Sequence, residues 1–176
     1  MKEKLVKRNT IYKGRILNFF VDDVKLPDGN KSTREVVQHP GAVTIIPLLN
    51  KYQVVLVKQY RYAIQKLTFE FPAGTLHKGE NPLLCAKREL TEETGYRAKL
   101  FKKLITFYTA PGFCSELMHL FLATGLTKLS SQNLDVDEFV EMEEMSLKSA
   151  FKMLRSGRII DSKTIIGLLL LKEMKC

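Results

Sequence analysis

The chain has 176 residues, of which 45% are hydrophobic, and its formal net charge is +9 at pH 7. This length fits one domain with enough core to fold alone, and the sequence has no low-complexity tract or internal repeat. The longest apolar run, residues 165–171, is too short to span a bilayer, and no apolar segment follows the N-terminal Met-Lys-Glu-Lys. We therefore expect neither a membrane span nor a signal peptide.

The basic charge and the cysteines bear on partners and compartment. The lysines are scattered, with no run of five or six and no known nucleic-acid motif. This favours general surface charge and a small anionic substrate over a nucleic-acid partner. Cys85, Cys114 and Cys176 are odd in number and widely spaced. We interpret them as reduced thiols, which predicts a cytoplasmic location.

Strands dominate the first part of the chain. In chain order, the predicted strands are 14–25, 33–39, 41–49, 52–60 and 68–71. A turn at 27–30 separates the first two, and Asn50-Lys51 joins the third and fourth as a hairpin rich in β-branched residues. Residues 74–79 are predicted to form a loop.

A short helix with clear ends follows this loop. Asn81 is a good N-cap, Pro82 suits the first helical position, and Gly95 can close the C-terminus. Later strands are predicted at 104–108, 118–123 and 139–145, followed by one helix from the Ser146 cap to Gly157 and another over 162–175. Mixed strands with three helices suit an α/β/α sandwich.

The first helix carries three carboxylates on one face. Glu89, Glu92 and Glu93 fall within an arc of about 100°. Their like charges repel, so a positive partner has to compensate them. Arg88 lies four residues before Glu92 and can hold part of the cluster. Hard divalent cations such as Mg²⁺ take oxygen ligands, so the pattern itself suggests a metal site.

One ordered pattern contains this helix. It runs Gly74, five residues, Glu80, seven residues, Arg88-Glu89-Leu90, one residue, Glu92-Glu93, one residue, Gly95-Tyr96. The pattern resembles the Nudix box, with every defining position filled. The resemblance implies an α/β (α+β) fold, the Nudix-type α/β/α sandwich with mixed β-sheets. It also implies a strand-rich N-terminal extension over residues 1–40 and a Nudix hydrolase domain over 41–176.

Segments outside the box look like the ADP-ribose pyrophosphatase branch of that family. They are 70–74 (EFPAG), 108–113 (YTAPGF) with Pro111 sixteen residues past Gly95, the acidic stretch 134–141, and 157–164. The resemblance implies metal-dependent hydrolysis of a nucleoside diphosphate linked to another group, with ADP-ribose giving AMP and ribose 5-phosphate. The alternatives are GDP-mannose, NADH or FAD as substrate, a non-catalytic ligand-sensing module, and an RNA pyrophosphohydrolase.

The resemblance also implies roles for individual residues. Glu89 and Glu93 would be the main ligands of two or three Mg²⁺ ions, with Mn²⁺ as the alternative. Glu80 would be an outer ligand, and the Ala73 carbonyl would also coordinate. Glu92 would be a further ligand or a support, and with Arg88 it would complete the catalytic set. Glu138 is the predicted general base, with Asp135 and Asp137 as alternatives. Local chemistry alone favours a solvated turn for these three loop residues.

The predicted substrate contacts are Arg61, Arg34, Glu116, Gly74 and Phe20. Arg61 has a planar fork suited to phosphate, whereas Arg34 also fits an ordinary surface arginine. Glu116 would bind a ribose hydroxyl or face solvent. Phe20, or its neighbour Phe19, would stack on adenine or pack in the core. By analogy with the resembling enzymes, the N-terminal strands exchange with a partner subunit, which predicts a homodimer.

Overall fold

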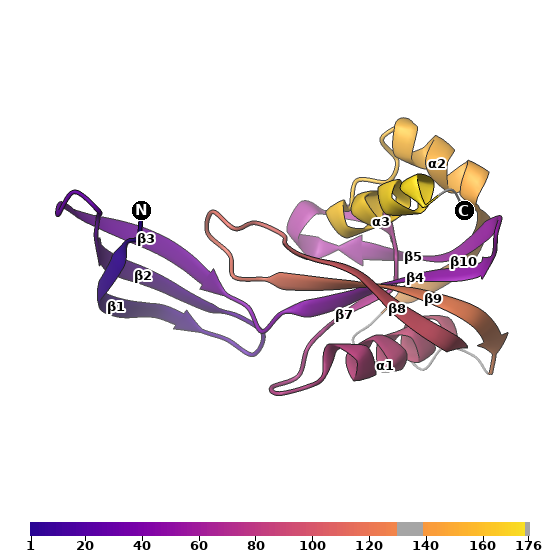
Figure 1. The fold of residues 1–176 in the computed structure, drawn as a ribbon, viewed down its shortest axis with the longest axis horizontal. Helices are drawn as coiled ribbons and strands as arrows, with labels where there is room; N and C mark the ends of the chain where they lie inside the picture. The colour runs from indigo at the N-terminus through magenta and orange to yellow at the C-terminus, as the bar shows by residue number, and fades with distance from the viewer. Residues whose placement is uncertain (130–138, 175–176) are drawn as a thin grey trace. The chain divides into compact units, whose positions relative to one another are not determined.

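The computed structural model describes residues 1–129 and 139–174, and the chain divides into two compact units (Figure 1). The first unit contains residues 1–41 and 107–117, and the second contains 42–106 and 118–176. The segment 107–117 therefore belongs with the N-terminal residues, although the sequence analysis placed it in the domain 41–176. The functional division predicted at residue 40 stays a prediction.

The first unit is built on an antiparallel sheet of β1 (Lys4–Lys13), β2 (Asn18–Lys25) and β3 (Lys31–Gln38). The first strand was predicted to begin at Gly14, but Gly14 lies between β1 and β2, where its N–H donates to the Leu17 carbonyl at 2.9 Å. All but one residue of β1 are exposed. Its sequence therefore lacks the alternation of apolar and polar residues that marks a half-buried strand.

The buried side of this sheet centres on β2. Phe20, Asp22 and Val24 are buried there. The Arg8 guanidinium donates to both carboxylate oxygens of Asp22, at 2.9 and 2.7 Å, and lies 4.3 Å from the centroid of the Phe20 ring. The pair satisfies a buried carboxylate and covers the aromatic ring.

The second unit contains a mixed sheet. In the described residues its strand order is β10-β5-β4-β9-β8, with β6 paired to β5 and β7 to β4. These strands are β4 (Ala42–Asn50), β5 (Gln53–Arg61), β6 (Lys66–Glu70), β7 (Ala73–Thr75), β8 (Tyr96–Tyr108), β9 (Leu117–Lys128) and β10 (Val140–Ser146), with a 3₁₀ turn at Tyr62–Ile64 after β5. β4 is parallel to β9 and antiparallel to β7. The predicted loop 74–79 thus begins as a short strand, and the predicted strand 104–108 is the end of a longer one.

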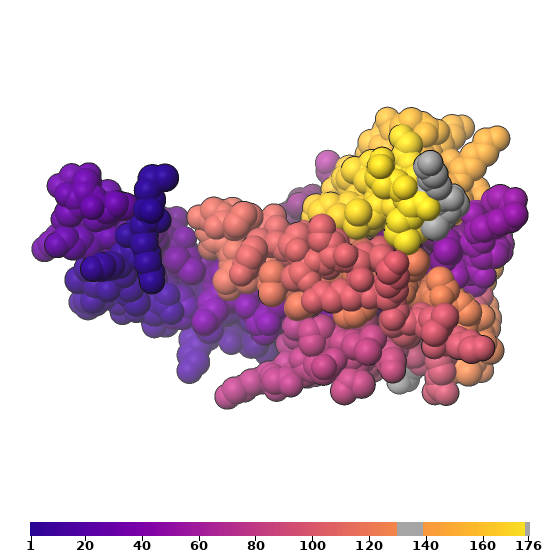
Figure 2. All heavy atoms as spheres, in the orientation of Figure 1, coloured from indigo at the N-terminus to yellow at the C-terminus, as the bar shows by residue number. Residues whose placement is uncertain are grey.

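Helices cover both faces of this sheet. α1 (Pro82–Thr94) lies on one face, and α2 (Leu147–Arg155) and α3 (Ser162–Glu173) lie on the other (Figures 1 and 2). β4 is buried from Ala42 to Pro47, since both of its faces are covered. Val43 and Ile45 join the core cluster that includes Leu90 of α1. This arrangement confirms the predicted sandwich.

The three predicted helices are present among the described residues, and the predicted caps are found at both ends of α1 and at the start of α2. α2 ends at Arg155, before the predicted Gly157, and α3 ends at Glu173 after an Asp161 cap that was not predicted. The Asn81 side chain accepts a hydrogen bond from the Leu83 N–H, and Gly95 closes α1 with φ 69°. Ser146 caps α2 in the same way. No helix in the described ranges 1–129 and 139–174 has the length and apolar character needed to cross a membrane.

Candidate active site

Two of the three α1 carboxylates point into the protein. Glu89 is 7% exposed and Glu93 is 4% exposed, whereas the Glu92 side chain is 33% exposed. Burying two carboxylates on adjacent turns of one helix costs free energy unless positive charge or hydrogen-bond donors compensate them. The compensation comes from Arg88 and from the backbone of the segment before the helix.

Arg88 contacts three carboxylates at once. Its Nη1 lies 2.8 Å from Glu92 Oε2 and 2.8 Å from Glu89 Oε1, and its Nε lies 3.3 Å from Glu80 Oε1. Burial lowers the pKa of Arg88, but the hydrogen bond that it donates to Glu80 and the charge of Glu89 outweigh this effect and raise that pKa. Arg88 therefore stays charged, and it links the helix to the loop that carries Glu80.

The chain at Ala73 and Gly74 lies directly against the two buried carboxylates. The Ala73 N–H donates to Glu93 Oε2 at 3.0 Å. A Cβ on Gly74 would come within 1.8 Å of Glu89 Oε1, so no residue with a side chain fits there without displacing Glu89. Gly74 is thus required for this close approach. Its predicted contact with substrate stays a prediction.

The oxygen donors gathered here are of the chemical type that a hard divalent ion binds. Carboxylate and carbonyl oxygens are the ligands that Mg²⁺ takes, and the Gly74 backbone leaves Glu89 the room it occupies. Within residues 1–129 and 139–174, no three His, Cys, Asp or Glu side chains already converge as a metal site. In this arrangement the positive charge of Arg88 compensates the negative charges of Glu80, Glu89 and Glu92.

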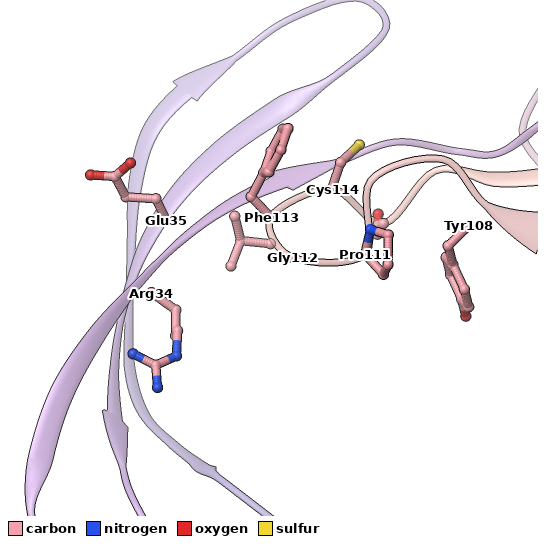
Figure 3. A pocket seen from close by; sticks show the side chains of 9 residues that line it. Arg34, Glu35, Tyr108, Pro111, Gly112, Phe113 and Cys114 are labelled. Atoms are coloured by element: carbon pink, nitrogen blue, oxygen red, sulfur yellow. The ribbon is translucent and has the colours of Figure 1, made fainter. Parts of the chain in front are cut away.

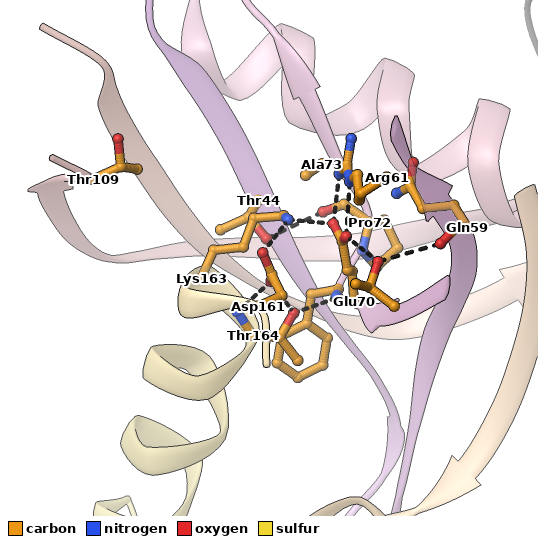
Figure 4. A network of polar contacts seen from close by, with 12 residues as sticks. Thr44, Gln59, Arg61, Glu70, Pro72, Ala73, Thr109, Asp161, Lys163 and Thr164 are labelled. Carbon is orange, nitrogen blue, oxygen red and sulfur yellow. Dashed lines mark hydrogen bonds and ion pairs between the residues drawn. The ribbon is translucent and has the colours of Figure 1, made fainter. Parts of the chain in front are cut away.

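A buried polar network lies beside the same segment, at the end of β6 (Figure 4). Glu70 is 1% exposed, and Arg61 donates to its two carboxylate oxygens at 2.8 and 2.5 Å. Lys163, at the start of α3, also donates to Glu70 and lies 2.8 Å from Asp161 Oδ1. Burial raises the pKa of Glu70, but the hydrogen bond from Arg61 and the charge of Lys163 reverse this and hold it at about 2.

This network includes one predicted substrate contact and several residues given no role by the sequence analysis. Arg61 is the predicted contact; its side chain remains 43% exposed although Glu70 holds its fork. Glu70, Asp161 and Lys163 lie in segments that resemble the ADP-ribose pyrophosphatase branch, but the sequence alone assigned them no individual role. A glutamate within the apolar run Leu67 to Phe71 was the available signal, because a buried strand keeps a carboxylate only with a partner.

Three of the predicted substrate contacts, Phe20, Arg34 and Glu116, belong to the first unit. Phe20 is 8% exposed and covered by Arg8, as expected for the alternative of core packing. The Arg34 Nε donates to Glu3 at 3.0 Å. Glu116 accepts a hydrogen bond from Thr109 Oγ1 at 2.7 Å. Their predicted roles toward substrate stay predictions.

A pocket of about 370 Å³ lies in this unit. It is lined by Arg34, Glu35, Val36, Tyr108, Pro111, Gly112, Phe113, Cys114 and Ser115. Figure 3 shows Arg34 and Glu35 projecting from β3 in different directions, with Phe113 and Cys114 on the neighbouring loop. The Val37 N–H donates to the Phe113 carbonyl at 2.7 Å, which joins this loop to β3. Glu138, Asp135 and Asp137 lie outside the described residues.

Comparison with known proteins gives two family matches. Residues 38–165 match the NUDIX domain, and residues 3–37 match the nucleoside diphosphate sugar hydrolase N-terminal domain. A crystal structure described as an ADP compounds hydrolase aligns with a TM-score of 0.85 at 22% identity, covering 99% of this chain and 94% of that chain. This likeness shows the fold.

Three curated relatives align over nearly the whole chain. The methanol dehydrogenase activator of Bacillus methanolicus is 47% identical, over 94% of this chain and 90% of the relative. The ADP-ribose pyrophosphatase of Bacillus subtilis is 43% identical, over 98% and 95%. The GDP-mannose pyrophosphatase of Cronobacter sakazakii is 33% identical, over 94% and 90%. With these matches and the site on α1, the chain belongs to the Nudix hydrolase family.

Proposed function

We propose that this enzyme hydrolyses ADP-ribose to AMP and ribose 5-phosphate with the help of Mg²⁺. The observation that carries the proposal is the packing of Glu89 and Glu93 against the backbone of Ala73 and Gly74. The choice of substrate is supported by two relatives named ADP-ribose pyrophosphatase, which are 43% and 36% identical to this chain.

The reaction needs negative charge to be stabilised at the pyrophosphate. A water oxygen forms a bond to one phosphorus, the bridging P–O bond breaks, and the proton of the water passes to a base. Bound divalent ions supply positive charge that stabilises the phosphoryl oxygens. Glu89 and Glu93 would hold these ions with the Ala73 carbonyl, and Glu80 would be an outer ligand. Glu138 remains the proposed base.

Arg61 is the proposed phosphate contact in the second unit. Glu70 holds one edge of its guanidinium through two hydrogen bonds, while 43% of the side chain stays exposed. A pre-oriented, permanently charged fork binds a phosphate with little loss of side-chain entropy. Arg34, Glu116 and Phe20 remain proposed contacts to the rest of the substrate.

A substrate panel tests this proposal. We expect AMP release from ADP-ribose to depend on Mg²⁺ and to exceed cleavage of GDP-mannose, NADH and FAD by about tenfold or more in kcat/KM. Mn²⁺ is tested as the alternative ion. Preference for another member of the panel would keep the chemistry and replace the substrate. No cleavage of any of them would refute ADP-ribose as the substrate and leave the ligand-sensing alternative or a substrate outside the panel, with RNA oligomers tested as a separate arm.

We further propose that the enzyme is a homodimer and works in the cytoplasm. Six large apolar side chains are exposed on β1 and the following turn, at Leu5, Val6, Ile11, Tyr12, Ile16 and Leu17. Large apolar side chains that a single chain leaves exposed are covered by a partner in many assemblies. Light scattering should give twice the 20.2 kDa mass of the chain.

The free thiols Cys85 and Cys114 suit a reducing compartment, which supports the proposed cytoplasmic location.

Activation of an alcohol dehydrogenase is a second candidate function. It is favoured by the 47% identity to the methanol dehydrogenase activator. Adding the protein to purified methanol dehydrogenase of Bacillus methanolicus would test it, with turnover of the dehydrogenase as the measurement. An increase that disappears with Glu93→Gln would show that activation needs hydrolysis. No change would leave ADP-ribose hydrolysis as the proposed function.

A further inference from the structure

The N-terminus of α3 is hydrogen-bonded to the segment that carries Ala73. Asp161 caps the helix, accepting at Oδ2 from the Thr164 N–H at 2.9 Å. The Thr164 hydroxyl donates to the same oxygen at 2.6 Å and accepts from the Phe71 N–H at 2.8 Å. Thr164 is fully buried. One hydroxyl therefore connects a helix cap to the backbone two residues before Ala73.

α3 also packs directly against the segment that contains Phe71. A Cβ on Gly167 would lie 2.8 Å from Phe71 Cε2, so α3 packs directly on the Phe71 ring. Lys163, one residue before Thr164, is 7% exposed and joins Asp161 to Glu70. The start of α3 is thus held to the end of β6 by both a charged contact and a neutral one.

Successive backbone groups from Phe71 to Ala73 each have a partner on a different element. The Phe71 N–H bonds to Thr164 of α3. The Pro72 carbonyl accepts from the Ile45 N–H of β4 at 2.8 Å. The Ala73 N–H bonds to Glu93 of α1 at 3.0 Å. Loss of the first partner would leave a buried donor unsatisfied and free the peptide that leads into Ala73.

We propose that Thr164 is a positioning residue for hydrolysis: through the Phe71 N–H it sets the Ala73 backbone against Glu93. The inference rests on the proposed function, because it assigns that backbone to the reaction. Thr164 itself is assigned no contact with metal or substrate. It acts by positioning the Ala73 backbone and Glu93, which are the proposed metal ligands.

Thr164→Val and Thr164→Ser form a matched pair for testing this role. Valine keeps the volume and removes the hydroxyl, while serine keeps the hydroxyl. We expect Thr164→Val to lower kcat by about 10- to 100-fold with little change in KM, and to weaken Mn²⁺ binding by a similar factor. Thr164→Ser should stay within about threefold of the wild type in both quantities. Amide hydrogen exchange over residues 69–75 should be faster only in the valine variant.

Leu171→Ala is the control for a merely structural effect. Leu171 is 1% exposed and lies on the same helix, but shares none of these hydrogen bonds. It should lower the melting temperature and keep the wild-type kcat. Equal kcat loss in Leu171→Ala and Thr164→Val would overturn the proposal, as would wild-type exchange and kcat in Thr164→Val. Exchange and Mn²⁺ binding need no substrate, so they decide the positioning role even if ADP-ribose is not cleaved.

Discussion

Glu93→Gln is expected to lower turnover of ADP-ribose by about 100-fold or more while leaving the fold intact. The substitution removes the charge of a carboxylate that is 4% exposed and lies against Ala73. Glutamine has the same length and retains an oxygen that can accept from the Ala73 N–H. The loss should therefore appear in kcat and in Mn²⁺ affinity, with a melting temperature close to that of the wild type.

Glu143→Gln is the matched control for this variant. The same substitution can be made at Glu143 on β10, where the glutamate side chain is exposed. It should leave both turnover and Mn²⁺ binding unchanged. A Glu93→Gln enzyme with the wild-type rate would show that Glu93 is not a metal ligand in the reaction.

Glu70→Gln is expected to lower the free energy of unfolding by about 3 kcal/mol at pH 7. The pKa of Glu70 is about 2, against 4.5 for an ordinary glutamate, so its charged form is favoured in the folded protein. Between pH 4.5 and pH 2 the unfolded chain takes up a proton that the folded protein does not. This part of the stability is therefore complete above about pH 5 and is lost as the pH falls toward 2.

Urea unfolding of the wild type and of Glu70→Gln at several pH values would measure this contribution. The difference between the two should be largest at neutral pH and shrink as the solution is acidified. Glu141→Gln is the control, because Glu141 pairs with Lys58 at 3.0 Å but its side chain is 76% exposed. Removing such a surface pair should cost less than about 1 kcal/mol. Parallel pH curves for the wild type and Glu70→Gln would contradict the assignment to Glu70.

The parts of the site that follow from local chemistry were predictable from the sequence. The ends of α1 were set by Asn81, Pro82 and Gly95, whose capping preferences act within a few residues. The contact of Arg88 with Glu92 follows from their spacing of four on a helix. Its contact with Glu80, which lies in the preceding loop, needed the path of the chain between them.

The parts that depend on distant segments were not predictable. Phe71 and Thr164 are separated by 93 residues, as are Glu70 and Lys163. No local pattern indicates that these residues meet, because α3 reaches β6 only when the helix packs on the sheet to which β6 belongs. Strand β1 was missed for a different reason: an exposed strand has no buried face to impose a period on its sequence.

The exposure of β1 in the N-terminal sheet affects how the stability of that sheet has to be measured. Small sheets with one uncovered side are marginal by themselves. If a second copy covers β1, the free energy of unfolding of this sheet includes a contribution from dimer formation, which grows with protein concentration. Dilution would then open β1 to amide exchange before the helices of the second unit, and the loss of the N-terminal sheet would depend on protein concentration.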